Sequence, residues 1–227
     1  MSVKKQFTIH SQSYNEYNLI QNKVIHDVLA KVKSAPESIL DLGSGTGYLY
    51  NSIDWPIKNY YAVDFSEKML ALHPSSKEVE LILGDFNNSL LFNEFKNIKI
   101  DRIFSTSSLQ WAIDLDATFH NIKNLDVPVS FAIFTSNTFK TIFETANIHP
   151  LLRSVEEVTF LANKYFDAEL ETKNYKLLFD DTKEMFRYIK KSGVSGARNI
   201  LDYKSMKNLM DNYPLNYLEF EVLFITQ

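Results

Sequence analysis

The chain has 227 residues, of which 45% are hydrophobic and 23% are charged, so it can bury the core of one large domain. It contains no cysteine, which excludes disulfides, thiolate metal sites and cysteine nucleophiles. A formal charge of −4 disfavours nucleic acid as a partner, and no apolar run is long enough to predict a membrane span. The polar N-terminal sequence has no signal-peptide pattern, so we expect a soluble, cytoplasmic protein.

The first predicted strand is followed by a glycine-rich turn. Residues 38–40 form a short apolar run, the turn is Asp41-Leu-Gly43-Ser-Gly45-Thr-Gly47, and residues 48–53 predict the start of a helix. Such a turn lets a ligand lie against bare backbone near helix N-terminal amides. The spacing lacks the third glycine of a dinucleotide fingerprint and the lysine of a phosphate-binding loop. It therefore argues against both of those ligand classes.

The second and third predicted strands also end in acidic residues. Residues 60–63 lead into Asp64, about 20 residues past the first glycine, where a carboxylate can accept both hydroxyls of a ribose. Ser66 is a predicted N-cap of the next helix. Residues 79–83 lead into Gly84-Asp85-Phe86, where the carboxylate can accept from an exocyclic amine and the aromatic ring can cover a base. These strand ends predict a nucleoside-containing ligand.

Two more strands complete the predicted parallel sheet. Residues 100–104 form the fourth strand, with Arg102 expected on a helix-facing or exposed surface, and residues 127–134 form the fifth. Strands that alternate with helices and end in polar or glycine residues indicate an open α/β sheet with its ligand at the switch point.

These segments resemble four motifs of the class I S-adenosylmethionine-dependent methyltransferases, in order along residues 35–135. The motifs are matched by residues 39–47, Asp64, residues 84–86 and residues 105–111. The resemblance implies a Rossmann-like fold, with a seven-stranded, mostly parallel sheet whose last two strands form an antiparallel hairpin, and S-adenosyl-L-methionine as cofactor. The cofactor-binding residues that it implies are Asp41, Gly43, Ser44, Gly45, Gly47, Asp64, Phe65, Met69, Asp85, Phe86 and Ser105.

The residue types that the predicted site lacks limit which classes of methyl acceptor are possible. Ser105-Thr-Ser-Ser108 does not match the motif of amide-nitrogen methyltransferases, and cytosine-C5 chemistry needs a cysteine. Asp114 and Asp116 are expected to cap a helix and charge its first turn, so we predict no metal site. A carboxylate acceptor is ionised at pH 7 and needs no protein base, so we expect no catalytic residue. Arginine suits a planar carboxylate, and the candidates are Arg153, Arg187 and Arg198.

Residues 182–207 form a basic segment within an acidic chain. Their seven cationic and two acidic side chains give +5, which leaves −9 for the remainder. A helix over residues 182–191 would place cations on one face and Met185, Phe186 and Ile189 inward. This face is either a solvated surface or a docking site for an acidic partner. The candidate docking residues are Lys183, Arg187, Lys190 and Lys191.

A closer resemblance connects the N-terminus, the segment after the fourth strand and the basic segment. Residues 13–17, 107–111 and 185–196 resemble the malonyl-[acyl-carrier-protein] O-methyltransferases of biotin synthesis. This resemblance implies methylation of the free carboxyl of malonyl-acyl carrier protein. It also implies one domain over residues 1–227, with an N-terminal helical cap over 1–34 and a lid over 182–213 before the last strand. The substrate-binding candidates are Tyr14, Gln110, Trp111, Arg153, Arg187 and Arg198, and Tyr14 would also contact the cofactor.

Two alternatives remain open. The acceptor could be another small carboxylic acid, as in enzymes that resemble trans-aconitate methyltransferase. The chain could instead be a non-catalytic nucleoside-binding module whose basic segment contacts a protein.

Overall fold

The computed structural model describes residues 19–192 and 203–227, with side chains 190–192 and 203 left out. Their core is a seven-stranded sheet in the order β3-β2-β1-β4-β5-β7-β6. Its strands are β1 (Ser38–Leu42), β2 (Asn59–Asp64), β3 (Val79–Leu83), β4 (Arg102–Thr106), β5 (Val129–Phe134), β6 (Glu169–Leu178) and β7 (Tyr217–Thr226). The strands β1 to β5 pair in parallel, whereas β7 is antiparallel to both β5 and β6. The predicted fold class is confirmed.

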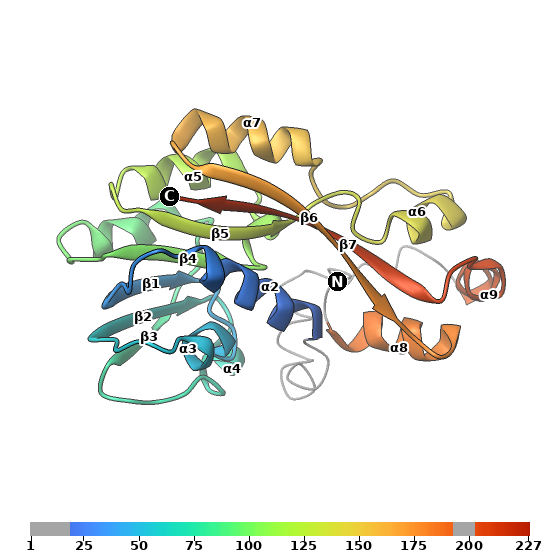
Figure 1. The fold of residues 1–227 in the computed structure, drawn as a ribbon, viewed down its shortest axis with the longest axis horizontal. Coiled ribbons are helices and arrows are strands. Elements are labelled where there is room, and N and C mark those ends of the chain that lie inside the picture. The colour runs from blue at the N-terminus through green and yellow to red at the C-terminus, as the bar shows by residue number, and fades with distance from the viewer. Residues whose placement is uncertain (1–18, 193–202) are drawn as a thin grey trace.

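Helices cover both faces of this sheet (Figure 1). They are α2 (Leu19–Lys31), α3 (Tyr48–Ser52), α4 (Glu67–Leu70), η1 (Ser89–Phe95), η2 (Leu109–Trp111), α5 (Leu115–Lys123), α6 (Lys140–Ala146), α7 (Val155–Tyr165), α8 (Thr182–Ser192) and α9 (Tyr203–Asn212). The side chains of Ser66 and Asp114 accept hydrogen bonds from the first turns of α4 and α5, so both predicted N-caps are confirmed.

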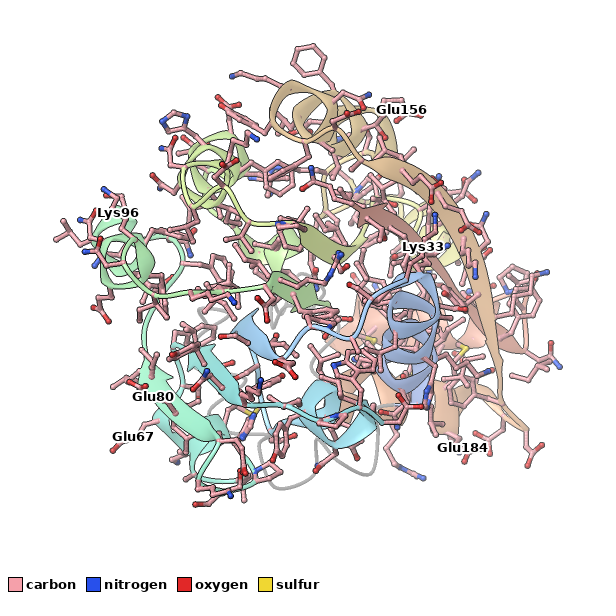
Figure 2. The ribbon with its side chains drawn as sticks, turned by 60° about the vertical axis from the view of Figure 1, so that its left-hand side comes forward. Lys33, Glu67, Glu80, Lys96, Glu156 and Glu184 are labelled. Carbon is pink, nitrogen blue, oxygen red and sulfur yellow. The ribbon has the colours of Figure 1, made fainter. Side chains whose placement is uncertain are left out.

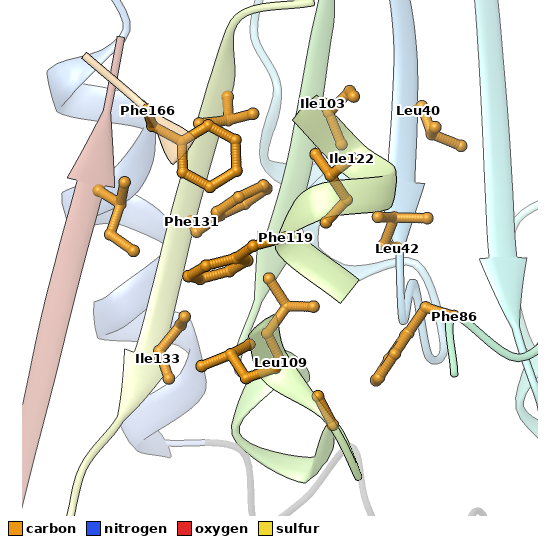
Figure 3. Close-up of a cluster of buried hydrophobic side chains, with 14 of the residues drawn as sticks. Leu40, Leu42, Phe86, Ile103, Leu109, Phe119, Ile122, Phe131, Ile133 and Phe166 are labelled. Atoms are coloured by element: carbon orange, nitrogen blue, oxygen red, sulfur yellow. The ribbon is translucent and has the colours of Figure 1, made fainter. Parts of the chain in front are cut away.

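The buried strands separate two apolar clusters because successive side chains point to opposite faces of the sheet. One cluster joins α5 and α7 to the sheet. In it the Phe119 ring stacks on Phe131 at 6.1 Å and meets Phe166 edge-on at 5.1 Å (Figure 3). The other cluster joins α2, α6, α8 and α9 to the opposite face. Each face of the sheet thus has its own core.

The hairpin of β6 and β7 extends past the parallel strands and has α8 and α9 near its far end (Figure 1). On α8, Met185 and Tyr188 are buried, whereas Lys183 and Arg187 are exposed. Phe186 and Ile189 pack, partly buried, against the same core. The predicted helix and its inward apolar side are therefore confirmed.

Arg102 is not exposed, and by strand alternation it shares the face of Phe104, which packs in the cluster with α2, so of the two expected positions the structure favours the helix-facing one. Arg102 begins β4 and is buried. Its Nη1 donates to the Val129 carbonyl, to Ser130 Oγ and to the Gln227 carbonyl, at 3.2, 2.9 and 2.7 Å. A buried guanidinium is tolerated here because three oxygens from β5 and the end of the chain accept hydrogen bonds from it.

Charged side chains lie on the periphery, as Glu67, Glu80, Lys96 and Glu156 illustrate (Figure 2). Within residues 19–192 and 203–227, no helix is long and apolar enough to cross a membrane. The same residues contain no group of three or more histidine or acidic side chains arranged to hold a metal ion.

Candidate functional site

A cavity that is open to solvent at its mouth lies at the carboxyl ends of β1, β2 and β4. Its walls come from the loops that follow these strands and from the loop after β3. The lining residues are Gly43, Gly45, Asp64, Phe65, Met69, Phe86, Thr106, Ser107, Ser108 and Trp111. Ligands of open α/β sheets bind in this position, where neighbouring connections diverge to opposite faces.

The glycine-rich turn forms the floor of the cavity, and Gly43 is required by close packing. Its φ is +78°, and an added Cβ would lie 2.4 Å from the Cβ of Ser108. The backbone amides of Gly43 and Ser44 donate to the Val63 carbonyl at 2.8 and 2.9 Å. These bonds tie the turn to the end of β2.

Gly45 and Gly47 differ in what surrounds them. Gly45 has a φ of +57°, and an added Cβ would meet no atom within 4 Å. Gly47 has a φ of +80°, and its Cβ would press on Pro74 and His73. Gly45 therefore faces open space in the cavity, whereas Gly47 packs against the protein and is absent from the lining.

Asp64 supplies the carboxylate of the cavity. Its Oδ2 accepts from the Gly45 amide at 3.0 Å and its Oδ1 from the Ser66 amide at 2.8 Å. Burial raises the pKa of this carboxyl to about 6, while those two amides act in the opposite direction. At pH 7 the group is ionised, and each oxygen keeps a lone pair that can accept a ligand hydroxyl.

Asp41 is buried and does not line the cavity. Its Oδ2 accepts from the Tyr60 hydroxyl at 2.7 Å, and its Oδ1 has no partner among the described residues. Burial raises the pKa of Asp41 to about 7. Ser44 is likewise buried, and its Oγ has no described partner. The turn thus has unsatisfied polar atoms close to its glycines.

The loop after β3 places its two predicted site residues differently. Phe86 is buried and lines the cavity, beyond the carboxyl end of the strands (Figure 3). Asp85 is not among the lining residues. Its Oδ1 accepts from the Asn87 amide at 3.0 Å and from Asn87 Nδ2 at 2.8 Å. Asp85 therefore shapes the loop in this structure.

After β4, the cavity is lined by residues that the sequence analysis did not select. Ser105 is fully buried, with its Oγ 2.8 Å from the Leu42 carbonyl, so it joins β4 to β1. Thr106, Ser107 and Ser108 line the cavity instead. Their position directly after a predicted strand end is the signal that could have identified them.

Trp111 and Gln110 also lie in different positions relative to the cavity. Trp111 lines the cavity. Gln110 is buried outside the lining, and its Nε2 donates to the Ser107 carbonyl at 2.7 Å. Trp111 is thus the aromatic wall on the β4 side, and Gln110 supports the loop behind it.

Arg153 and Arg187 do not line this cavity, and no other cationic side chain of the described residues lines it. Arg153 Nη2 donates to the carbonyls of Ala112 and Ile113 at 2.8 and 3.1 Å. Its Nε lies 3.2 Å from Glu157 Oε1. Arg187 is exposed on α8. Tyr14, Arg198 and the side chains of Lys190 and Lys191 lie outside the described part of the chain.

Comparisons with known proteins agree with this arrangement. Residues 40–134 match the model of a methyltransferase domain. The chain is 24% identical to malonyl-[acyl-carrier protein] O-methyltransferase of Bacillus anthracis, over 86% of this chain and 81% of the relative. It is 28% identical to malonyl-[acyl-carrier protein] O-methyltransferase 2 of Coxiella burnetii, over 91% and 85%.

Solved structures share the fold at low sequence identity. The YcgJ protein of Bacillus subtilis superposes with a TM-score of 0.60 and 11% identity, over 90% of this chain and 98% of that one. Phosphoethanolamine N-methyltransferase 2 of Haemonchus contortus, solved with S-adenosylhomocysteine, gives a TM-score of 0.54 and 16% identity, over 92% and 53%. The cavity therefore lies within a methyltransferase fold.

Proposed function

We propose that this chain, a class I methyltransferase, transfers a methyl group from S-adenosyl-L-methionine to the free carboxyl of a malonyl group on acyl carrier protein. The observation that carries the proposal is the cavity bounded by Gly45, Asp64 and Phe86 on one side and by Trp111 on the other. The reaction would be an early step of biotin synthesis, in the cytoplasm.

The groups of the cavity fit the cofactor. The ionised Asp64 offers acceptors for the ribose hydroxyls, and the Phe86 ring offers a face for adenine. The open space at Gly45 leaves room for the methionine portion, beside buried oxygens of Asp41 and Ser44 that have no described partner. When bound, the cofactor supplies a methyl group on a positively charged sulfur.

The protein's part in the reaction is to position and desolvate the acceptor. With the cofactor bound, the protein would hold a carboxylate oxygen of the acceptor in line with the methyl carbon, so that transfer would make an O–C bond and release a neutral thioether. An acceptor carboxylate that is already ionised at pH 7 needs no protein base, so the proposal requires no proton transfer. Phe65, Met69 and Trp111 supply apolar surface that excludes water from the reacting atoms.

An acidic carrier protein is supported by two features. Relatives that align with most of this chain carry the name of that activity. In addition, α8 exposes the cationic side chains of Lys183 and Arg187. We assign these two with Lys190 and Lys191 to carrier docking, and Tyr14 and Arg198 to the acceptor, whereas Gln110 supports the loop that carries Trp111.

The direct test is an intact-mass assay of the full chain with S-adenosylmethionine. Malonyl-loaded acyl carrier protein, malonyl-coenzyme A and free dicarboxylic acids would be run in parallel. A carrier species heavier by one methyl group in place of hydrogen is the expected result. Methylation confined to a free acid would overturn the carrier assignment, and no methylation of any acceptor would favour a nucleoside-binding module.

A further inference from the structure

The segment that follows Trp111 is held in place by two loops from distant parts of the sequence. Ala112 and Ile113 lie between η2 and α5, outside regular structure. The Ile113 side chain is 83% exposed, so its own packing contributes little to the position of the segment. Ala112 is buried in the apolar core, so it is at Ile113 that polar contacts to the backbone hold the segment.

The first contact comes from the loop after β3. Asn87 Oδ1 accepts from the Ile113 amide at 2.8 Å. Asn87 is itself oriented by Asp85, whose Oδ1 accepts from both the amide and the Nδ2 of Asn87. The loop that carries Phe86 on one wall of the cavity therefore connects to the segment that carries Trp111 on another.

The second contact comes from the residue before the N-cap of α7. Arg153 Nη2 donates to the carbonyls of Ala112 and Ile113, while Glu157 pairs with its Nε at 3.2 Å. The Arg153 carbonyl also accepts from the Ser136 amide at 2.9 Å, in the loop after β5. Loops that follow β3, β4 and β5 are thus joined at residues 112–113.

We infer that Asn87 and Arg153 are positioning residues that hold Trp111 in the cavity wall, and that Arg153 acts through this contact and does not bind the acceptor carboxylate. Arg153 fits this role because its Nη2 and Nε already contact the Ala112 carbonyl and Glu157, and because it does not line the cavity. The consequence for acceptor turnover rests on the proposed function, but the position of Trp111 does not.

The chain offers a specific probe of this position. Its two tryptophans are Trp55 and Trp111, so W55F leaves Trp111 as the only tryptophan. In this background, R153A and N87A should shift Trp111 emission to longer wavelength and increase its quenching by acrylamide. K164A is the matched control, because it removes an exposed ion pair between α7 and Asp116 without touching residues 112–113.

Activity supplies the second readout. R153A should raise KM for the acceptor by about tenfold, the loss expected from a charge-assisted hydrogen bond, with a smaller change in kcat. R153K, which can still donate to a carbonyl, should recover part of both readouts. N87A, which does not alter the cation, keeps the test decisive if R153A fails to fold.

The two explanations for Arg153 give different results. Lost acceptor affinity with unchanged Trp111 emission and quenching would overturn the positioning role and restore direct carboxylate binding. Altered quenching in R153A and N87A, with a normal K164A, supports the inference even if the carrier substrate itself proves wrong.

Discussion

The β1–β3 side of the cavity and its β4–β5 side are held together by different kinds of contact. On the first side, Asp64 accepts from the amides of Gly45 and Ser66, which are close to it in sequence or in the adjoining turn. On the second, Arg153 reaches about 40 residues back along the chain to Ala112 and Ile113. Local contacts leave a motif in the sequence, whereas long-range side-chain contacts do not.

Glu221 extends the contrast. This buried residue of β7 accepts from Thr135 Oγ1 at 2.5 Å and from Asn137 Nδ2 at 2.9 Å. It therefore fixes the loop after β5 from a strand more than 80 residues away. The β4–β5 side of the cavity therefore depends on contacts from the hairpin of β6 and β7, whereas the glycine-rich turn does not.

The largest expected effect breaks the β1–β3 side through its backbone. In G43A the new Cβ would collide with Ser108 at a positive φ, which should cost about 3 kcal/mol or more and abolish cofactor binding. G45A meets no atom and should cost only about 1 kcal/mol of strain. Thermal unfolding and calorimetry of both variants make the comparison, and equal losses would contradict the packing role of Gly43.

A destabilisation of similar size is expected on the β4–β5 side of the cavity from E221A. This substitution leaves Thr135 and Asn137 without their acceptors and should lower the free energy of unfolding by about 3 kcal/mol. E219A is the matched control on the same strand, because Glu219 is half-buried and bonds Thr141. Denaturant unfolding should show E221A to be the more destabilised variant. The reverse order would show that the bonds of Glu221 to Thr135 and Asn137 contribute little to stability.

A smaller effect is expected at the surface of α8. The double variant K183E/R187E should raise KM for malonyl-acyl carrier protein by about tenfold, because rim charges steer an acidic partner. Malonyl-coenzyme A should be affected much less. K96E reverses an exposed charge on the opposite side of the molecule and serves as the control (Figure 2). Equal losses with K96E would argue against docking on α8.

The smallest effect concerns pH. Burial raises the pKa of Asp41 to about 7, above its ordinary value of 3.8, so the folded state binds a proton that the unfolded state releases. The stabilisation of the folded state by this proton is present at low pH and is lost as pH rises toward and through 7. Between pH 5.5 and 8, the native protein should lose about 5 °C more in Tm than D41N. Parallel curves would show that Asp41 does not titrate in this range.

The sequence predicted the β1–β3 side better than the rest. The strand ends, the two N-caps and the cavity positions of Gly43, Gly45 and Asp64 follow from local patterns of apolar, glycine and acidic residues. The hydrogen bonds of Arg102 could not be predicted, because its acceptors come from β5 and from the end of the chain, which no local pattern reveals.

The β4–β5 side of the cavity was harder to predict from the sequence for the same reason. Arg153 looked available for a carboxylate because its contacts with Ala112 and Ile113 arise only in the folded protein. Phe139 adopts a φ of +61°, unusual for a bulky residue, because its amide bonds the Glu219 carbonyl and its ring packs on Phe220 at 5.1 Å. Tertiary contacts outweigh local preference at such positions.

The claim that the β1–β3 side binds the cofactor is tested most directly by calorimetry with S-adenosylhomocysteine. The native protein, D64N and R153A would be compared at pH 7.5, with Tm measured to verify folding. Loss of the Asp64 charge should weaken binding about tenfold or more, whereas R153A, which alters only the Trp111 wall of the cavity, should weaken it much less. Native affinity in D64N, or an equal loss in R153A, would contradict the assignment of the cofactor to this side.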